Sequence, residues 1–264
     1  MPKVKANDIQ VYYEVKGEGF PLMMIAGMGV NIDSWDPRLV EQLARKFKVV
    51  VFDNRGAGRT DASDRKYTIK LFADDTVGLM DALGISKAHI LGHSMGGRIA
   101  QELVLGYPKR VEKLVLCSSS CGGPRSVPMS KDVMGRFMAD RSTLSQEEAV
   151  RMVTPLFLTE DFIKKSPEVV ELIIQQGRKA PFSNEVFKRQ VLASMECDTH
   201  DRLPQIKTPT LILQGKQDIL IAPGNASILA EAIPNAKLVY FEKSAHRLAE
   251  EMNEVINSII DFLV

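Results

Sequence analysis

The sequence lacks the features that would tie it to a membrane or to nucleic acid. No run of about 18 apolar residues occurs along its 264 residues, so no transmembrane helix is expected. The opening segment, MPKVKANDIQVYYEV, has no apolar stretch typical of a signal peptide. The 34 lysines and arginines nearly balance the 33 aspartates and glutamates, which gives no electrostatic attraction to DNA, RNA or an anionic membrane. We therefore expect a cytoplasmic protein with neither nucleic acid nor a membrane as a partner.

Cysteine is scarce, and no metal or cofactor motif is present. The three cysteines, Cys117, Cys121 and Cys197, are an odd number in a chain too long to need disulfide bonds. They form no CxxC motif and no cluster with histidine at the spacing of zinc ligands, so no metal site is expected. The segments GMG and RGAGR lack the spacing of phosphate-binding or dinucleotide-binding loops. We therefore expect no cofactor, and a buried, unreactive thiol at Cys117.

The apolar segments alternate with helical patterns over most of the chain. Short runs rich in Val, Ile and Leu are typical of parallel strands buried on both faces, so the alternation predicts an α/β fold. The first residues favour a hairpin, residues 3–15. The predicted strands that follow are residues 21–27, 48–54, 87–94, 112–118, 208–215 and 236–242. The predicted helices are residues 35–46, 68–83, 95–106, 225–232 and 248–263.

The alternation stops between residues 120 and 203. This stretch opens with CGGPRSVP, whose glycines and prolines mark a boundary, and continues with helical patterns and no clear strand. We therefore divide the chain into a core of residues 1–119 and 204–264 and a helical lid of residues 120–203. Five methionines and five phenylalanines predict an adaptable apolar surface on the lid, although most must form its own core. They are Met129, Met134, Met138, Met152, Met195, Phe137, Phe157, Phe162, Phe182 and Phe187.

The segment GHSMGG, residues 92–97, places Ser94 between two glycines where a predicted strand meets a predicted helix. A tight turn of this kind strains its central residue, and the glycines remove side chains that would collide there. The Ser94 hydroxyl then lies above the carboxyl edge of the sheet, where open α/β sheets bind ligands. The pattern predicts a nucleophile. The alternative is a serine that only caps the following helix.

The chain resembles the α/β-hydrolase superfamily, in particular its serine esterases with a helical lid. GHSMGG (92–97), FDNRGAGRT (52–60) and SAHRLAEEMNEVINSIIDFL (244–263) carry the resemblance, which spans nearly the whole length. It implies an eight-stranded, mostly parallel sheet flanked by helices, with the lid inserted after strand six. It also implies a catalytic triad in the order nucleophile, acid, histidine. A serine at position 94 argues against the aspartate nucleophile of the epoxide hydrolases and haloalkane dehalogenases of this fold.

Two residues in the last part of the chain are the candidates for base and acid. His246 follows a predicted strand, at the position where the family carries its base. Asp218 follows the preceding strand, 28 residues earlier, where a carboxylate can orient the histidine. A variant of the fold carries its acid after strand six, but no carboxylate occurs there before Asp132. The alternatives are a surface histidine and an aspartate that caps the next helix.

The other three histidines are weaker candidates for the base. His93 directly precedes Ser94, and adjacent residues of an extended chain point to opposite sides, so we do not expect it to serve as the base. Its role is left open. His89 is expected to be a hydrogen-bonded residue inside the sheet. His200 is expected where the lid returns to the core.

Acyl transfer also needs donors for the negative charge on the attacked carbonyl oxygen. The family resemblance implies the backbone N–H groups of Met95, directly after the nucleophile, and of Met28, in the loop AGMGV (26–30). Many relatives carry His-Gly in this loop, whereas this chain has Ala26 and Gly27. The support of the loop therefore differs from the usual one.

Together, Ser94, Asp218 and His246 predict a serine hydrolase that forms an acyl-enzyme on Ser94. We expect a carboxylesterase for small to medium acyl groups, acting on a small-molecule ester or thioester. An acyl thioesterase, an enol-lactonase or a carbon–carbon bond hydrolase would use the same three residues. A ligand-binding receptor with slow turnover could also retain them, because a fold does not fix a function.

Overall fold

The computed structural model describes residues 2–141, 143–180 and 183–264. Its strands are β1 (Lys3–Ala6), β2 (Ile9–Lys16), β3 (Pro21–Ile25), β4 (Lys48–Phe52), β5 (Ala88–His93), β6 (Val111–Cys117), β7 (Thr210–Gly215) and β8 (Lys237–Phe241). They form one eight-stranded sheet in the order β1-β2-β4-β3-β5-β6-β7-β8. The β1–β2 and β2–β4 pairs are antiparallel, and all the other neighbours are parallel. The predicted mostly parallel α/β-hydrolase sheet is confirmed.

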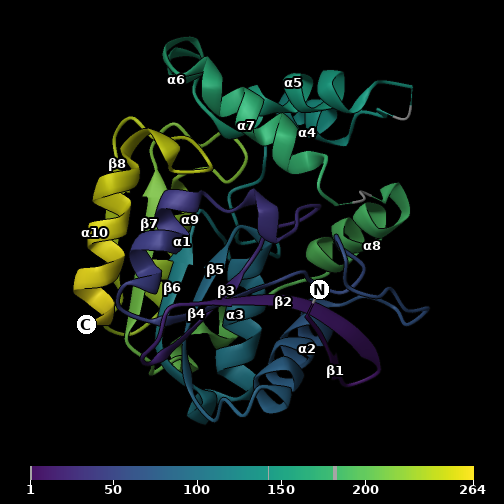
Figure 1. Ribbon diagram of the computed structural model, residues 1–264. Helices are drawn as coiled ribbons and strands as arrows, with labels where there is room; N and C mark the ends of the chain where they lie inside the picture. The colour runs from purple at the N-terminus through teal and green to yellow at the C-terminus, as the bar shows by residue number, and fades with distance from the viewer. Residues whose placement is uncertain (1, 142, 181–182) are drawn as a thin grey trace.

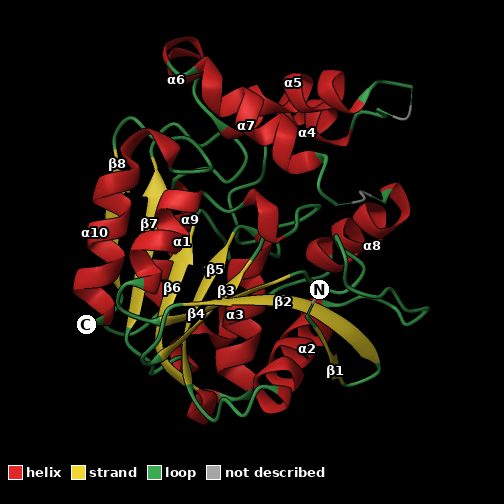
Figure 2. Ribbon diagram, in the orientation of Figure 1, coloured by secondary structure: helices red, strands yellow, loops and turns green. Residues whose placement is uncertain are grey.

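Helices cover both faces of this sheet (Figure 2). They are α1 (Pro37–Ala44), α2 (Ile69–Ala82), α3 (Met95–Gly106), α4 (Lys131–Met138), α5 (Gln146–Phe157), α6 (Glu160–Lys165), α7 (Pro167–Gly177), α8 (Asn184–Met195), α9 (Gly224–Ala232) and α10 (Met252–Leu263). Helices α2, α3 and α9 share one apolar cluster with the sheet, and α1 and α10 share a second cluster. The sheet is therefore the middle of three layers.

Alternating side chains of the central strands fill both clusters. In β3, Met23 and Ile25 belong to the cluster with α2 and α3, whereas Leu22 and Met24 belong to the cluster with α1 and α10. All four side chains are fully buried. Because successive side chains of a strand point to opposite faces, a strand covered on both sides must be apolar throughout. This is why the continuous apolar runs predicted these strands.

Two helices begin at least two residues later than the sequence predicts. The Asp36 side chain accepts a hydrogen bond from the Arg38 N–H, and Pro37 occupies the first turn, so α1 begins at Pro37 rather than at the preceding residues. Near the end of the chain, Leu248 opens the predicted helix but has a left-handed backbone with φ 55°, and Ala249–Glu251 form a short 3-10 helix. The α-helix α10 follows and begins at Met252.

The lid helices α4 to α8 all lie between β6 and β7 in the sequence. Helices α4 to α7 lie together beyond the carboxyl ends of the parallel strands, and α8 lies apart from them, closer to the sheet (Figure 1). Within the described part of this stretch, the only strand-like pairing is a single bridge between Gly122 and Asp198. The domain boundaries at residues 119 and 204 stay a prediction, and Phe182 lies outside the described residues.

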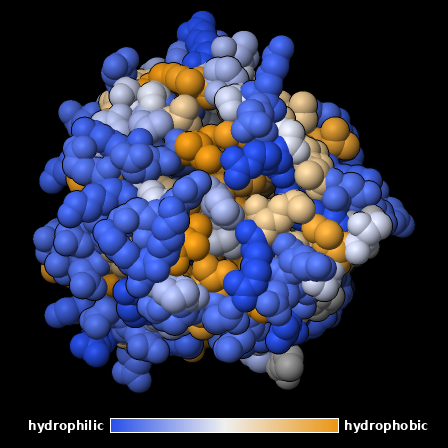
Figure 3. Space-filling model, turned by 90° about the horizontal axis from the view of Figure 1, so that it is seen from above, coloured by the Kyte–Doolittle hydropathy of each residue, from blue (hydrophilic) through white to orange (hydrophobic). Residues whose placement is uncertain are grey.

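Apolar side chains are exposed on the lid. In the view from above, they gather between hydrophilic residues around the middle of the face (Figure 3). Four of the five lid methionines are among the exposed apolar residues of the chain, together with two leucines and a valine. They are Met134, Met138, Met152, Met195, Leu172, Leu192 and Val127.

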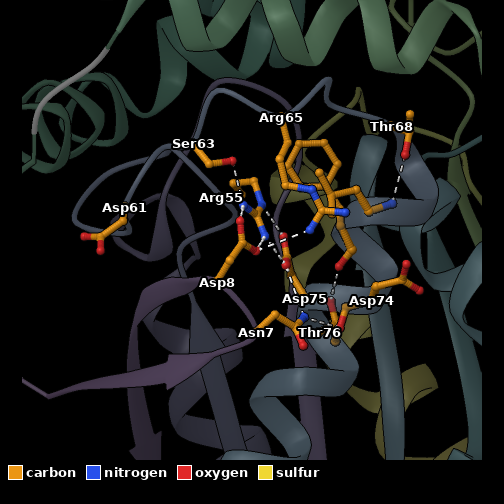
Figure 4. A network of polar contacts seen from close by, with 12 residues as sticks. Asn7, Asp8, Arg55, Asp61, Ser63, Arg65, Thr68, Asp74, Asp75 and Thr76 are labelled. Atoms are coloured by element: carbon orange, nitrogen blue, oxygen red, sulfur yellow. Dashed lines mark hydrogen bonds and ion pairs between the residues drawn. The ribbon is translucent and has the colours of Figure 1, made fainter.

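A buried arginine fastens the amino-terminal hairpin to the core. The side chain of Arg55 is fully buried, and its five N–H groups donate to Asp75, Asp8 and Ser63 over 2.5–3.0 Å (Figure 4). Asp75 belongs to α2, whereas Asp8 lies in the turn between β1 and β2. Because no donor of the guanidinium is left over for a ligand, Arg55 has a structural role.

Candidate active site

Ser94 stands at the turn between β5 and α3, with a backbone that non-glycine residues rarely adopt. Its φ is 58° and its ψ is −120°. Hydrogen bonds fix this conformation from both sides: the Ser94 N–H donates to the Cys117 carbonyl at 2.9 Å, and the Ser119 hydroxyl donates to the Ser94 carbonyl at 2.8 Å. A strained residue that its surroundings hold in place is typical of functional sites. The predicted sharp strand-to-helix turn is present.

The glycines around Ser94 are required by close backbone contacts. A Cβ atom on Gly92 would lie 2.3 Å from the Gly96 carbonyl oxygen, and one on Gly96 would lie 2.1 Å from the Ile25 carbonyl oxygen. No real Cβ tolerates either distance. The strand β5, the turn and the helix α3 therefore pack closely only with glycine at these positions.

His246 and Asp218 come together in the loops that follow β8 and β7. The distance from His246 Nδ1 to Asp218 Oδ2 is 2.8 Å, and both side chains are buried. Asp218 also accepts the N–H groups of Leu220 and Ile221 at 2.9 Å each, and the Gln214 amide at 3.1 Å. Because the carboxylate accepts the bond, Nδ1 of His246 carries the proton, and Nε2 keeps its lone pair free.

His93 contacts His246 rather than replacing it. Its Nε2 lies 2.9 Å from the His246 carbonyl oxygen, and the two ring centroids are 4.9 Å apart. A carbonyl only accepts hydrogen bonds, so Nε2 of His93 is the donor and cannot also take a proton from Ser94. Burial, together with the nearby His246, lowers the pKa of His93 to about 3, which keeps the ring neutral. Sequence reasoning missed this bond, because the two residues that it joins are 153 positions apart.

The loop after β3 lies against Ser94. A Cβ atom on Gly27 would be 3.2 Å from the Ser94 Cβ, so the backbone of this loop approaches the serine closely. The Asn54 amide donates to the Ala26 carbonyl at 3.0 Å, which holds the start of the loop. Among the described residues, the backbone N–H groups of Met28 and Met95 have no hydrogen-bond partner. Two free donors therefore lie in the segments that flank Ser94.

Aromatic side chains of the lid cover the histidine. The Phe157 ring, at the end of α5, lies 5.8 Å from the His246 ring, and Phe137 of α4 lies 6.4 Å from Phe157. The Arg247 N–H donates to the Phe157 carbonyl at 3.1 Å, which ties α5 to the residue after His246. Phe187 of α8 contacts Phe137 with ring centroids 5.7 Å apart. The lid thus presents an apolar surface to the histidine.

The remaining candidates lie elsewhere. His89 packs against the rings of Phe20 and Phe47 and forms no hydrogen bond to another described residue, so the expected hydrogen bond is wrong. Burial lowers its pKa to about 4, and a neutral ring surrounded by apolar groups needs no charged partner. His200 belongs to the short helix His200–Gln205, where the chain returns from the lid, and pairs with Asp201.

Two further properties bear on the chemistry of the chain. Among the described residues, no group of three or more His, Cys, Asp or Glu side chains is arranged to hold a metal ion, and no helix is long and apolar enough to cross a membrane. Cys117 is buried, and burial raises the pKa of its thiol to about 12, as expected for an unreactive cysteine.

Comparison with known proteins identifies the family of this fold. The alpha/beta hydrolase fold family model matches residues 21–251. Relatives named "Putative carbamate hydrolase RutD" include one from Azorhizobium caulinodans, 29% identical over 98% of this chain and 97% of its own length. Another, from Caulobacter sp. (strain K31), is 30% identical over 96% of this chain and 95% of its own length.

Solved structures agree over the whole chain. The enol-lactonase from Burkholderia xenovorans LB400 has a TM-score of 0.85 at 25% identity, covering 99% of both chains. A thermophilic esterase from Thermogutta terrifontis has a TM-score of 0.83 at 28% identity, covering 99% of this chain and 97% of its own. With the family model matched over most of its length, this chain belongs to the α/β-hydrolase family.

Proposed function

We propose that this protein hydrolyses carboxylic esters through an acyl-enzyme on Ser94. The observation that carries the proposal is the strained serine turn, together with a buried His246–Asp218 pair whose imidazole packs against His93, the neighbour of the serine, and two free backbone N–H groups in the segments that flank the turn. A serine alone is a weak nucleophile and needs an adjacent base, an orienting group for that base and donors for the oxyanion. In this proposal the nucleophile is Ser94, the base is His246 and the orienting group is Asp218. The oxyanion donors are the backbone N–H groups of Met28 and Met95.

The chemistry follows from the hydrogen bonds. Ser94 Oγ attacks the ester carbonyl while His246 Nε2 accepts the hydroxyl proton, and the resulting oxyanion receives the N–H groups of Met28 and Met95. Collapse of this intermediate breaks the ester C–O bond, and His246 returns the proton to the leaving alcohol. Water then attacks the acyl-enzyme by the same route, which releases the acid and restores Ser94. Asp218 keeps the proton on Nδ1 throughout and stabilises the imidazolium.

The lid favours acyl groups of small to medium size. Phe157 lies over His246, and Phe137 backs it, so the space above the proposed base is bounded by aromatic rings. An apolar surface stabilises an alkyl chain in proportion to the area that it removes from water. The substrate is therefore a small molecule, with an oxygen ester as the first choice and a thioester as the alternative.

The experiment compares matched substrates on the purified protein. We expect hydrolysis of p-nitrophenyl butanoate, covalent labelling by a serine-reactive phosphonate, and loss of both in Ser94→Ala. Ser258→Ala, which removes an exposed hydroxyl on α10, should retain both and serves as the matched control. The thioester of butanoic acid with p-nitrothiophenol, assayed beside the ester, ranks the two classes. If the protein shows no turnover and no labelling, the proposal of an enzyme is refuted. Tight ligand binding without turnover would favour a receptor.

A second candidate is a carbamate hydrolase, which the name of the RutD relatives suggests. A carbamate carbonyl is a poorer electrophile because the nitrogen lone pair is conjugated with it, but the same serine, base and oxyanion donors would serve. The test pairs p-nitrophenyl N,N-dimethylcarbamate with p-nitrophenyl 2-methylpropanoate, which has almost the same shape. A kcat/KM for the carbamate at or above that for the ester would replace the ester proposal with this one.

A further inference from the structure

The loop that carries Met28 has an unusual support. In place of a histidine within the loop itself, two amides from other segments hold it. Asn54 holds the Ala26 carbonyl, and the Gly29 N–H donates to Oε1 of Gln190 at 2.8 Å. Gln190 belongs to α8 and is fully buried. The end of the loop that follows Met28 is therefore held by the lid.

The second half of the Gln190 amide is unused. Because the Gly29 N–H requires an acceptor, Oε1 must face the loop, and the NH2 group must be the free end. Nε2 is buried and has no partner among the described residues. Gln101, another fully buried glutamine, has both ends paired: its Nε2 donates to the Ser120 carbonyl, and its Oε1 accepts from the Thr199 hydroxyl. A buried donor without a partner destabilises the folded state, so it indicates a role beyond stability.

The helix α8 is fastened to the core on both sides of Gln190. The Arg189 guanidinium stacks on Tyr67 at 3.7 Å from the ring centroid and donates to the Ser63 carbonyl at 2.6 Å. One turn after Gln190, the Ser194 carbonyl and hydroxyl accept from Arg98 of α3 at 2.6 and 2.9 Å. The position of Gln190 relative to the loop and to the elbow helix α3 is therefore fixed.

The charge of this region favours a ligand oxygen. Arg98 lies in the first turns of the helix that Ser94 begins, and its guanidinium contacts only serine oxygens: those of Ser194 and the Ser120 hydroxyl at 2.8 Å. Within the described residues it has no carboxylate partner, so its positive charge is uncompensated nearby. An electron-rich acceptor, such as a carbonyl, ether or carboxylate oxygen, suits a free N–H donor in this field.

We propose that Gln190 positions the oxyanion loop from the lid and donates its free N–H to a second acceptor oxygen of the substrate, beyond the carbonyl under attack. The inference rests on the proposed ester hydrolysis at Ser94 and names the substrate class: acyl compounds with an oxygen function along the acyl chain. Nε2 is covered by protein atoms, so the substrate reaches it by displacing a flexible neighbour.

The test separates the two roles of Gln190 by the choice of substrate. Three p-nitrophenyl esters of equal length are compared: the pentanoate, and the ethoxyacetate and 3-methoxypropanoate, in which oxygen replaces one methylene. In Gln190→Met, a loosened loop should lower kcat for all three esters. Loss of the donor should lower kcat/KM for at least one oxygen-bearing ester by a further factor of about ten, equivalent to about 1.4 kcal/mol. The comparison uses the ratio of kcat/KM between variant and wild type for each ester, so the intrinsic reactivities of the esters cancel.

A matched control lies on the same helix. Ser194→Ala removes a hydroxyl that α8 offers to Arg98 but leaves the contact between Gln190 and the loop intact. It should preserve the wild-type ratio between the oxygen-bearing and alkyl esters. An unchanged ratio in Gln190→Met would overturn the selection of acceptor oxygens, and an unchanged kcat for the pentanoate would overturn the positioning of the loop. The same change of ratio in Ser194→Ala would attribute both effects to loosening of α8 and overturn the proposal.

Binding of the product acids gives a readout that does not need turnover. In a Ser94→Ala background, the ratio of the dissociation constants for pentanoate and its oxygen-bearing analogues should shift about tenfold when Gln190→Met is added. Should the wild type hydrolyse no ester while this shift is observed, the ester proposal fails and the recognition by Gln190 stands. An unshifted ratio overturns the recognition whether or not esters are hydrolysed.

Discussion

Substitution of His93 tests whether a residue beside the nucleophile acts through the base. His93 donates one neutral hydrogen bond to the His246 carbonyl at 2.9 Å. A phenylalanine keeps an aromatic ring against Trp35 and His246 but removes the donor. A neutral hydrogen bond contributes about 0.5–1.5 kcal/mol, and leaving a buried carbonyl unpaired costs somewhat more. If this energy holds the base in place, His93→Phe should lower kcat roughly five- to thirtyfold.

The expected loss is far smaller than that for the proposed base itself. His246→Ala should lower kcat by roughly 10⁴–10⁶-fold, with no further loss when combined with Ser94→Ala. His93→Gln places an amide N–H near the position of the imidazole Nε2 and should recover most of the activity. The assay is steady-state hydrolysis of p-nitrophenyl butanoate, with thermal unfolding measured for each variant to exclude loss of the fold.

The pH profile supplies a second check on His93. Because its pKa is lowered to about 3, the ring is neutral at all pH values where such an enzyme would be assayed. The shape of the kcat/KM profile between about pH 5 and 9 should therefore be the same in His93→Phe and the wild type. A loss in His93→Phe equal to that in His246→Ala, in a folded protein, would make His93 the base. Full activity in His93→Phe would show that the bond to His246 has no catalytic consequence.

Three other predictions concern aspartates that pair with buried side chains. Asp75→Ala should lower the free energy of unfolding by about 3–5 kcal/mol because it leaves the buried Arg55 short of two hydrogen bonds. Asp8→Ala should lower it by at most about 1 kcal/mol because Asp8 is 40% exposed. Equal losses for the two variants in urea denaturation would refute this difference. The bond to Arg55 lowers the pKa of Asp8 from 3.8 to about 2. The small contribution of Asp8 to the free energy of unfolding should therefore be complete above pH 3.8 and disappear as the pH falls through about 2, which denaturation at several pH values can measure. Asp218→Asn should lower kcat roughly 10⁴-fold because an amide can stabilise the wrong tautomer of His246, and a loss below about tenfold would remove Asp218 from the proposed triad.

Much of the fold was predictable because a strand that is buried on both faces must consist of apolar residues, and its composition therefore indicates its burial. The continuous apolar run of β3 follows from burial on both faces, and the end of regular alternation at residue 120 indicated the inserted helices. Helix starts were less accurate. The beginning of α1 depends on Asp36 and Pro37, whose capping geometry outweighs the apolar pattern, and Leu248 is buried without being helical.

The candidate site was predictable where one segment contains the whole feature. The turn at Ser94 needs only a strand, a helix and two glycines, and all of these lie within a few residues of one another. His246 and Asp218 were identified through the family resemblance, and their contact at 2.8 Å is a property of two separate loops. The sequence suggested their positions at the carboxyl edge of the sheet but contained nothing about their distance.

The sequence by itself determined the succession of strands and helices along the chain and the strained serine turn, because these depend on local composition and short-range sterics, and its resemblance to a known family supplied the candidate acid and base. Only the tertiary structure decided which atoms meet. It paired His93 with the carbonyl of a residue 153 positions away, and it brought Gln190 of the lid to the loop of Met28 across 161 positions. A hydrogen bond depends on distances of about 3 Å and on direction, and residues so far apart in the chain acquire such geometry only when the core packs.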